Sequence, residues 1–132
     1  MTGAEAAAVG GKGPRPKVLV VEDEYLVALL VEDMLGSLGY EVAEIAGNLS
    51  DATRAAEGGE FDVAILDVNL NGTMSNPVAD ILARRKIPFI FATGYGKSGP
   101  HEDFVGAPSL QKPFEEGDLG RMLREVMAAE RQ

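Results

Sequence analysis

The stretch Lys-Val-Leu-Val-Val-Glu-Asp at residues 17–23 contains an uninterrupted apolar run that ends in two acids. A short apolar run of this kind predicts a strand that is buried on both faces of a sheet. Three later predicted strands are each followed by a polar residue: the almost wholly apolar 61–66 before Asp67, the apolar 88–92 before Thr93, and the short 108–111 before Lys112. The chain therefore places a polar side chain at the end of each of these predicted strands.

Segments with helical spacing separate the strands. Apolar residues recur every three or four positions over residues 24–38, which predicts a helix that Gly39 ends. Further elements are predicted as follows: a strand over 41–46, a helix over 49–57, a helix from Pro77 to 86 with Asn76 as its N-cap, and a helix from 115 onward. This alternation predicts a doubly wound α/β fold, in which helices cover both faces of a five-stranded parallel sheet.

Length and composition narrow the class of protein. The chain has 132 residues, which suits one domain, and it has no Cys and one His. The absence of Cys excludes a disulfide framework and a thiolate zinc site, and the single His excludes a multi-histidine metal cluster. The net charge of −9 argues against a nucleic-acid partner, because phosphate binding depends on clustered Lys and Arg.

The ends of the chain also carry expectations. Residues 1–16 are rich in Gly and Pro and are predicted to form a flexible tail before a domain over 17–131. The sequence has neither the apolar segment of a signal peptide nor a run of about 20 apolar residues that could span a membrane. We therefore expect a cytoplasmic protein with no membrane partner.

The polar residues that end the strands are the candidate functional residues. Parallel strands bring their carboxyl ends to one edge of the sheet, where ligands of such folds bind. The carboxylates of Glu22, Asp23 and Asp67 would repel one another there, and a divalent cation between them relieves the repulsion. Oxygen ligands without His or Cys favour Mg²⁺ or a close relative such as Mn²⁺. We expect Asp23 and Asp67 to bind the ion directly and Glu22 to reach it through water, with a backbone carbonyl just after Asp67 completing the site.

A carboxylate at such a site can also be a nucleophile that accepts a phosphoryl group. Asp67 is the better candidate because it stands alone at the end of its strand. The transferring group carries diffuse negative charge, so catalysis needs mainly positioning and positive charge. The Lys112 ammonium supplies charge in addition to the metal, and the Thr93 hydroxyl can donate to a phosphoryl oxygen.

Over residues 17–130 the sequence resembles the receiver domain of two-component response regulators. The matching segments are Val20-Val21-Glu22-Asp23-Glu24, Leu66-Asp67, Phe91-Ala92-Thr93-Gly94 and Lys112-Pro113-Phe114. The resemblance implies a flavodoxin-like sheet with strand order 2-1-3-4-5 and phosphorylation of Asp67. It also implies a Mg²⁺ pocket at Glu22 and Asp23 completed by the backbone carbonyl of Asn69, and phosphoryl contacts from Thr93 and Lys112.

The segment Phe91-Ala92-Thr93-Gly94-Tyr95 further resembles a subgroup of mostly single-domain receivers that work with sensor kinases of the HWE/HisKA2 type. Three departures from the common receiver stand out. Ser109 stands three positions before the conserved lysine, where the common receiver has an aromatic residue, so Thr93 has no ring at that position to couple to. The usual proline after the phosphorylated aspartate is missing from a loop predicted over 68–75. Glycines and a proline within 96–106 weaken the fourth helix and predict a mobile segment.

Two functions follow from these residues. The first is a phosphoacceptor switch, which is not an enzyme in the ordinary sense. It receives a phosphoryl group on Asp67 from a histidine kinase or a histidine phosphotransfer protein, and it acts through protein contacts or as a phosphate sink. The second is an aspartyl-phosphate phosphohydrolase that acts on a small substrate. Such enzymes usually have a second acid near the nucleophile, where this chain has the amide Asn69, so the sequence favours the switch.

Overall fold

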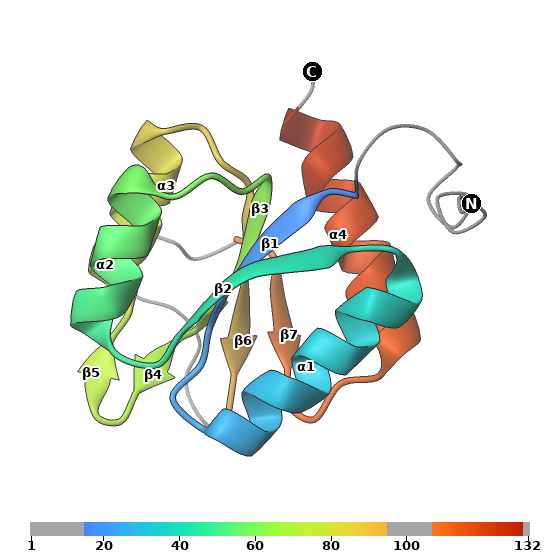
Figure 1. The fold of residues 1–132 in the computed structure, drawn as a ribbon, viewed down its shortest axis with the longest axis horizontal. Helices are drawn as coiled ribbons and strands as arrows, with labels where there is room; N and C mark the ends of the chain where they lie inside the picture. The colour runs from blue at the N-terminus through green and yellow to red at the C-terminus, as the bar shows by residue number, and fades with distance from the viewer. Residues whose placement is uncertain (1–14, 95–106, 131–132) are drawn as a thin grey trace.

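The computed structural model describes residues 15–94 and 107–130 (Figure 1). The elements of the main sheet are β1 (Lys17–Val21), β2 (Glu41–Ala46), β3 (Val63–Asp67), β6 (Phe89–Thr93) and β7 (Ser109–Gln111). The helices are α1 (Tyr25–Leu38), α2 (Leu49–Gly58), α3 (Asn76–Arg84) and α4 (Glu116–Glu130). Two further short strands, β4 (Asn69–Leu70) and β5 (Thr73–Met74), follow β3 directly.

The main sheet is parallel, with the spatial order β2-β1-β3-β6-β7. Counted along the chain, these five strands have the order 2-1-3-4-5, so the predicted topology is confirmed. The chain leaves β1 for β2 at one edge and then returns to β3 on the other side of β1. The order therefore reverses between β1 and β3, which is where open α/β sheets bind their ligands.

Helices cover both faces of the sheet, α2 and α3 on one side and α1 and α4 on the other (Figure 1). The alternation of side chains along β1 shows how the two layers form. Leu19 and Val21 belong to the core under α2 and α3, whereas Val18 and Val20 belong to the core under α1 and α4. All four are at most 1 % exposed, as expected of a central parallel strand.

The orientation of α1 differs from what its most conspicuous apolar residues suggest. Ala28, Val31 and Leu35 are its buried side chains, while Leu26 is 79 % exposed and Leu30 is 56 % exposed. Val31 and Leu35 of this stripe belong to the core that α1 and α4 form with the sheet. Several large apolar side chains of α1 are consequently left on the surface.

The predicted loop over 68–75 contains a β-hairpin. Leu70 pairs with Thr73 in antiparallel register, and the turn between them is formed by Asn71 with φ 53° and Gly72 with φ 94°. Asn-Gly is the preferred pair for a two-residue turn in which both residues have positive φ. The signal was present in the sequence, but strands of two residues are too short to show a hydrophobic pattern.

The N-cap of α3 is Ser75, and Asn76 is already helical, so the prediction of Asn76 as the cap was wrong by one residue. The sequence analysis also predicted a weak helix within 96–106, ahead of the helix labelled α4. That segment and Tyr95 lie outside the described residues. Among the helices that are described, none has the length and apolar character that crossing a membrane requires.

Candidate functional site

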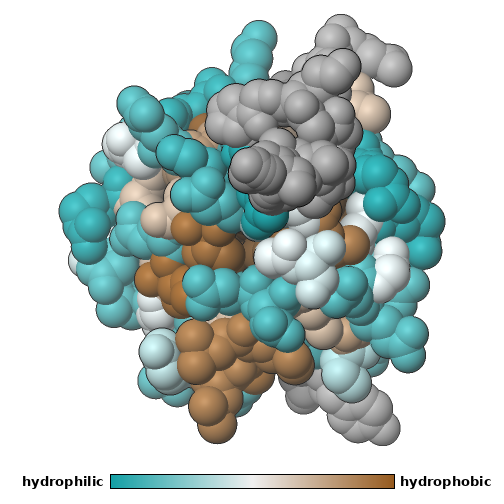
Figure 2. Space-filling view, turned by 45° about the vertical axis from the view of Figure 1, so that its right-hand side comes forward, coloured by the Kyte–Doolittle hydropathy of each residue, from teal (hydrophilic) through white to brown (hydrophobic). Residues whose placement is uncertain are grey.

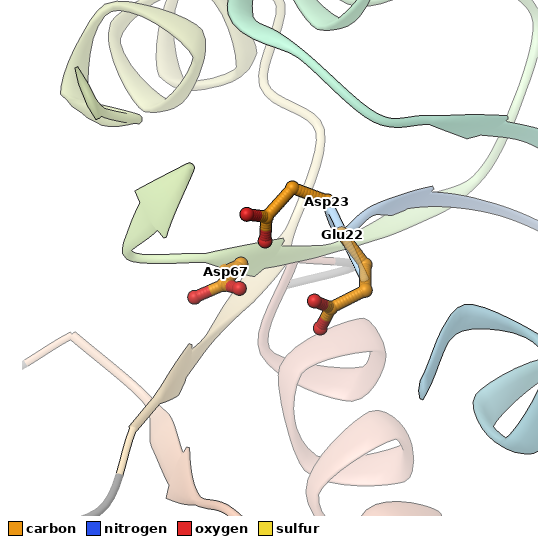
Figure 3. A group of neighbouring side chains, drawn as sticks. All are labelled: Glu22, Asp23 and Asp67. Carbon is orange, nitrogen blue, oxygen red and sulfur yellow. The ribbon is translucent and has the colours of Figure 1, made fainter. Parts of the chain in front are cut away.

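Three carboxylates meet at the point where the strand order reverses. Glu22 and Asp23 directly follow β1, and Asp67 is the last residue of β3. The two strands are direct neighbours, with Val21 paired to Leu66, so these acids leave the sheet side by side. One oxygen from each of the three carboxylates lies within 4.8 Å of the others, and Figure 3 shows the groups facing a common space. The set is suited to a hard divalent cation, which takes oxygen ligands.

Lys112 joins this group from the far end of the sheet. Its Nζ donates to Oε1 of Glu22 at 2.9 Å and to Oδ2 of Asp67 at 3.1 Å. The lysine follows β7, and its backbone N–H donates to the carbonyl of Thr93 at 2.8 Å, which ties it to the end of β6. Both carboxylate side chains are at most 8 % exposed, so the ammonium is their counter-ion in a largely dry place.

Hydrogen bonds fix the orientation of the two buried carboxylates. The second oxygen of Glu22, Oε2, accepts from the backbone N–H of Glu24 at 3.0 Å. The other oxygen of Asp67, Oδ1, accepts from the backbone N–H of Asn69 at 3.3 Å. Glu22 and Asp67 are therefore held at both oxygens. The half-buried Asp23 has no hydrogen-bond partner within residues 15–94 and 107–130, so its oxygens are free to bind an ion.

Burial and neighbouring charges shift the pKa values of Asp67 and Lys112. Desolvation raises the pKa of Asp67 from 3.8 to about 6, and the negative charge of Glu22 adds to the increase. The hydrogen bond and charge of Lys112, together with the Asn69 N–H, oppose it without cancelling it. For Lys112, desolvation lowers the pKa, but hydrogen bonds and charges from Glu22 and Asp67 outweigh it, so the net pKa is raised. Lys112 thus stays positively charged beside the two carboxylates.

A cleft of about 630 Å³ opens beside these groups. Asp23, Asp67 and Lys112 are among the polar residues that line it. Its apolar walls come from α1, from the β4–β5 hairpin and from the residues after β7: Val27, Leu30, Val31, Met34, Met74 and Phe114. This wall was not predicted from the sequence. The available signal was an excess of large apolar residues in α1, more than one buried face can use.

The other residues that the sequence analysis singled out make fewer contacts with the three acids and Lys112. Thr93 is half-buried at the end of β6, and its hydroxyl makes no hydrogen bond to the acids or Lys112 in the described part of the chain. Asn69 approaches Asp67 with its N–H, and its side-chain oxygen accepts from the Gly72 N–H at 2.6 Å within the hairpin. Ser109, in place of the aromatic residue of other receivers, is exposed on β7.

Comparisons with known proteins agree with this architecture. The family model of the response regulator receiver domain matches residues 18–124. The transcriptional regulatory protein PdtaR of Mycobacterium tuberculosis is 32 % identical over 107 residues, which cover 78 % of this chain and 52 % of PdtaR. The phyllosphere-induced regulator PhyR of Methylorubrum extorquens is 25 % identical over 119 residues, covering 84 % of this chain and 43 % of PhyR. The chain thus spans about half the length of these curated relatives.

Solved structures show the same relationship. SdrG from Sphingomonas melonis Fr1 is 38 % identical, with a TM-score of 0.78 over 88 % of this chain and 99 % of SdrG. The receiver domain of the sensor histidine kinase PA1611 from Pseudomonas aeruginosa, solved with a magnesium ion in its active-site cleft, is 27 % identical. Its TM-score is 0.74, over 86 % of this chain and 98 % of that domain. With its fold, its strand-end acids and its family match over most of its length, this chain belongs to the response regulator receiver domain family.

Proposed function

We propose that this chain is a response regulator that accepts a phosphoryl group on Asp67 in a Mg²⁺-dependent reaction. The observation that carries the proposal is the convergence on Asp67 of Lys112, at 3.1 Å, and of two further carboxylates within 4.8 Å. Phosphoryl transfer needs little covalent help from a protein and depends on positioning and on positive charge. The site offers a buried nucleophile, a fixed ammonium and a set of oxygen ligands.

Each residue has a distinct part in this reaction. An oxygen of Asp67 forms a bond to phosphorus, while the bond from phosphorus to the donor's imidazole nitrogen breaks and the electron pair stays on that nitrogen. Lys112 offsets the negative charge of the phosphoryl oxygens, and the Thr93 hydroxyl donates to one of them. The phosphorylated Asp67 carries about two negative charges, which strengthens the pull on Lys112.

The metal ligands that we propose start from Asp23, whose carboxylate accepts no hydrogen bond from the described residues. Asp23 and Asp67 would bind Mg²⁺ or Mn²⁺ directly, Asp67 through an oxygen that now accepts from Lys112 or from the Asn69 N–H, and the Asn69 backbone carbonyl would add a third protein ligand. Glu22 would keep its hydrogen bonds from Lys112 and the Glu24 N–H and act through a bound water. The ion would supply positive charge against the phosphoryl oxygens and hold them in line for transfer.

The donor that we propose is a sensor histidine kinase, of the HWE/HisKA2 type that the resemblance of segment Phe91–Tyr95 implies, or a histidine phosphotransfer protein. The exchange would take place in the cytoplasm. The receiver would span residues 17–131 after a tail over 1–16, signalling by protein contacts or draining phosphate from a kinase. Beyond its own phosphorylation and dephosphorylation it would catalyse no reaction.

The phosphohydrolase alternative gains no support from the site. It needs a second acid beside the nucleophile to protonate the leaving group. The position two residues after Asp67 holds Asn69, whose side-chain oxygen is engaged by the Gly72 N–H in the hairpin. The remaining acids, Glu22 and Asp23, are the ones that the cation needs.

Incubation with acetyl phosphate and Mg²⁺, followed by intact-mass measurement, tests the proposed function. We expect one phosphoryl adduct per chain, lost in Asp67→Asn and retained in Asp80→Asn, which changes an exposed aspartate on α3. An adduct that persists in Asp67→Asn would overturn the assignment. Multiple turnover of a small phosphate ester would favour the hydrolase instead.

A further inference from the structure

The cleft beside Asp67 is larger and more apolar than a phosphoryl group and a cation require. We propose that it binds the acyl part of small acyl phosphates, so that donors with a short apolar tail phosphorylate this chain faster than acetyl phosphate does. The inference rests on the proposed function and extends it to the choice of small-molecule donor. Its occupant is a linear acyl chain of a few carbons.

The lining of the cleft combines polar groups with apolar side chains. Asp67 and Lys112 line it together with other polar residues such as Glu24 and Asn69, and apolar side chains from three separate elements line it as well. Leu30 lies on α1, Met74 on β5 and Phe114 after β7. A volume of about 630 Å³ falls in the range of pockets that hold small ligands. An amphipathic anion, with a phosphate head and an apolar tail, matches this distribution.

The direction of phosphoryl transfer puts the tail in the cleft. The attacking and leaving oxygens lie roughly in line on opposite sides of phosphorus. A phosphoryl group bound at Asp67 and Lys112 therefore has its leaving group on the side away from Asp67, where the cleft that these two residues line would receive it. An oxygen of Asp67 bonds to phosphorus, the bond from phosphorus to the acyl oxygen breaks, and the electron pair leaves with the carboxylate. No proton needs to move, because the departing carboxylate is a weak base and leaves as an anion.

Burial of the acyl tail determines how strongly the chain should prefer longer acyl phosphates over acetyl phosphate. Each methylene that leaves water adds roughly a threefold to fourfold preference when fully buried. The wall is partly open, since Leu30 is 56 % exposed and Met74 is 40 % exposed. The two additional methylenes of butyryl phosphate should therefore raise the second-order rate constant of phosphorylation roughly threefold to tenfold over acetyl phosphate.

The chain supplies a matched control on the same helix. Leu26 is 79 % exposed and is not among the described residues that line the cleft, whereas Leu30, one helical turn later, lines it. In Figure 2, hydrophobic residues gather at the lower edge of the molecule, where Figure 1 places the first turns of α1. Serine at Leu26 or at Leu30 removes a similar exposed apolar side chain, and only the second change alters the cleft.

The experiment measures phosphorylation of the full chain by acetyl, propionyl and butyryl phosphate with Mg²⁺, using the time course of intact mass to obtain the second-order rate constant for each donor. We expect the rate to rise with chain length, and we expect Leu30→Ser and Met74→Ser to reduce the butyryl-to-acetyl ratio at least twofold. Leu26→Ser should leave both the ratio and the rates unchanged. Circular dichroism checks that each variant is folded.

The outcomes separate this inference from the proposed function. Equal rates for all three donors, with Asp67 phosphorylated by each, would overturn the inference and leave the proposed function standing. The inference also fails if Leu30→Ser and Met74→Ser slow transfer from a phosphorylated histidine protein while the three acyl phosphates react equally, because the wall then serves a protein donor. Failure of every donor to modify Asp67 would overturn the proposed function itself.

Discussion

The Nζ atom of Lys112 lies 3.1 Å from Oδ2 of Asp67, although 45 residues separate them in the chain. The same nitrogen lies 2.9 Å from Oε1 of Glu22, so a single ammonium group connects the ends of β1, β3 and β7. These contacts link the stability of the site to the chemistry that we propose for it.

Lys112→Met should lower both stability and phosphorylation. The substitution leaves two nearly buried carboxylates without their counter-ion, and we expect the free energy of unfolding to fall by about 1–3 kcal/mol. Phosphorylation of Asp67 by acetyl phosphate should slow at least tenfold, because the phosphoryl oxygens lose a positive charge. Urea unfolding and intact-mass kinetics provide the two measurements. Lys17→Met, an exposed change on β1, is the control, and equal behaviour of the two variants would contradict the role of Lys112.

The raised pKa of Asp67 predicts a pH dependence of stability in a solution free of divalent ions. The pKa of this carboxyl is 3.8 ordinarily and about 6 in the folded protein, so the folded state holds the proton more tightly than the unfolded state. Stability therefore falls as pH rises from near 3.8 to near 6, and it is constant with respect to this group above that window.

Asp67→Asn isolates this contribution. The free energy of unfolding of the unmodified chain minus that of the variant should decrease by about 1–3 kcal/mol across the window. Urea unfolding with a chelator, at several pH values, measures this difference. A difference that is constant or rises with pH would show that the folded protein does not raise the pKa of Asp67.

Asp23→Asn should weaken metal binding more than it weakens the fold. Asp23 is half-buried and has no hydrogen-bond partner among the described residues, so its carboxylate contributes mainly repulsion until a cation binds. We expect the affinity for Mg²⁺ to fall at least tenfold, and the metal-free variant to be as stable as the unmodified chain or more so. Calorimetric titration and thermal unfolding with and without Mg²⁺ test both statements. Asp33→Asn, on the exposed side of α1, should retain the affinity.

Substitution by alanine should have different effects on stability at two glycines of α4. A Cβ atom at Gly117 would meet no atom within 4 Å, so Gly117→Ala should stabilise the fold by about 0.5–1 kcal/mol through helix propensity. A Cβ atom at Gly120 would lie 2.8 Å from Cδ2 of Leu38 on α1. Gly120→Ala should therefore gain less than Gly117→Ala, or lose stability, because Leu38 must move. Chemical denaturation of both variants gives the order, and the reverse order would contradict the close packing of α1 and α4.

The sequence predicted the sheet and its polar edge because both depend on simple patterns. A buried parallel strand must be apolar throughout, so an acid such as Asp67 at the end of such a run marks the point where the chain leaves the core. The sequence did not predict which side of α1 faces the sheet. Apolar residues occur around much of this helix, and only the packed structure shows that Val31 is inside while Leu30 is outside.

The hairpin after Asp67 was missed for a different reason. Its strands have two residues each, and strand patterns cannot be recognised at that length. Asn71-Gly72 was the only local signal, and an Asn-Gly pair occurs in many loops as well as in hairpins. The apolar wall of the cleft could not be predicted without both features, because Leu30 of α1 and Met74 of this hairpin both line it.

The built-in counter-ion at Lys112 separates folding from activation. Since the Lys112 ammonium offsets part of the charge of Glu22 and Asp67, we expect the domain to fold and persist when magnesium is scarce. Swings in free cation concentration would then change how readily Asp67 is modified, without exposing the chain to unfolding and degradation. A cell could thus keep a standing stock of intact receiver and let ion supply and donor supply together decide when it responds.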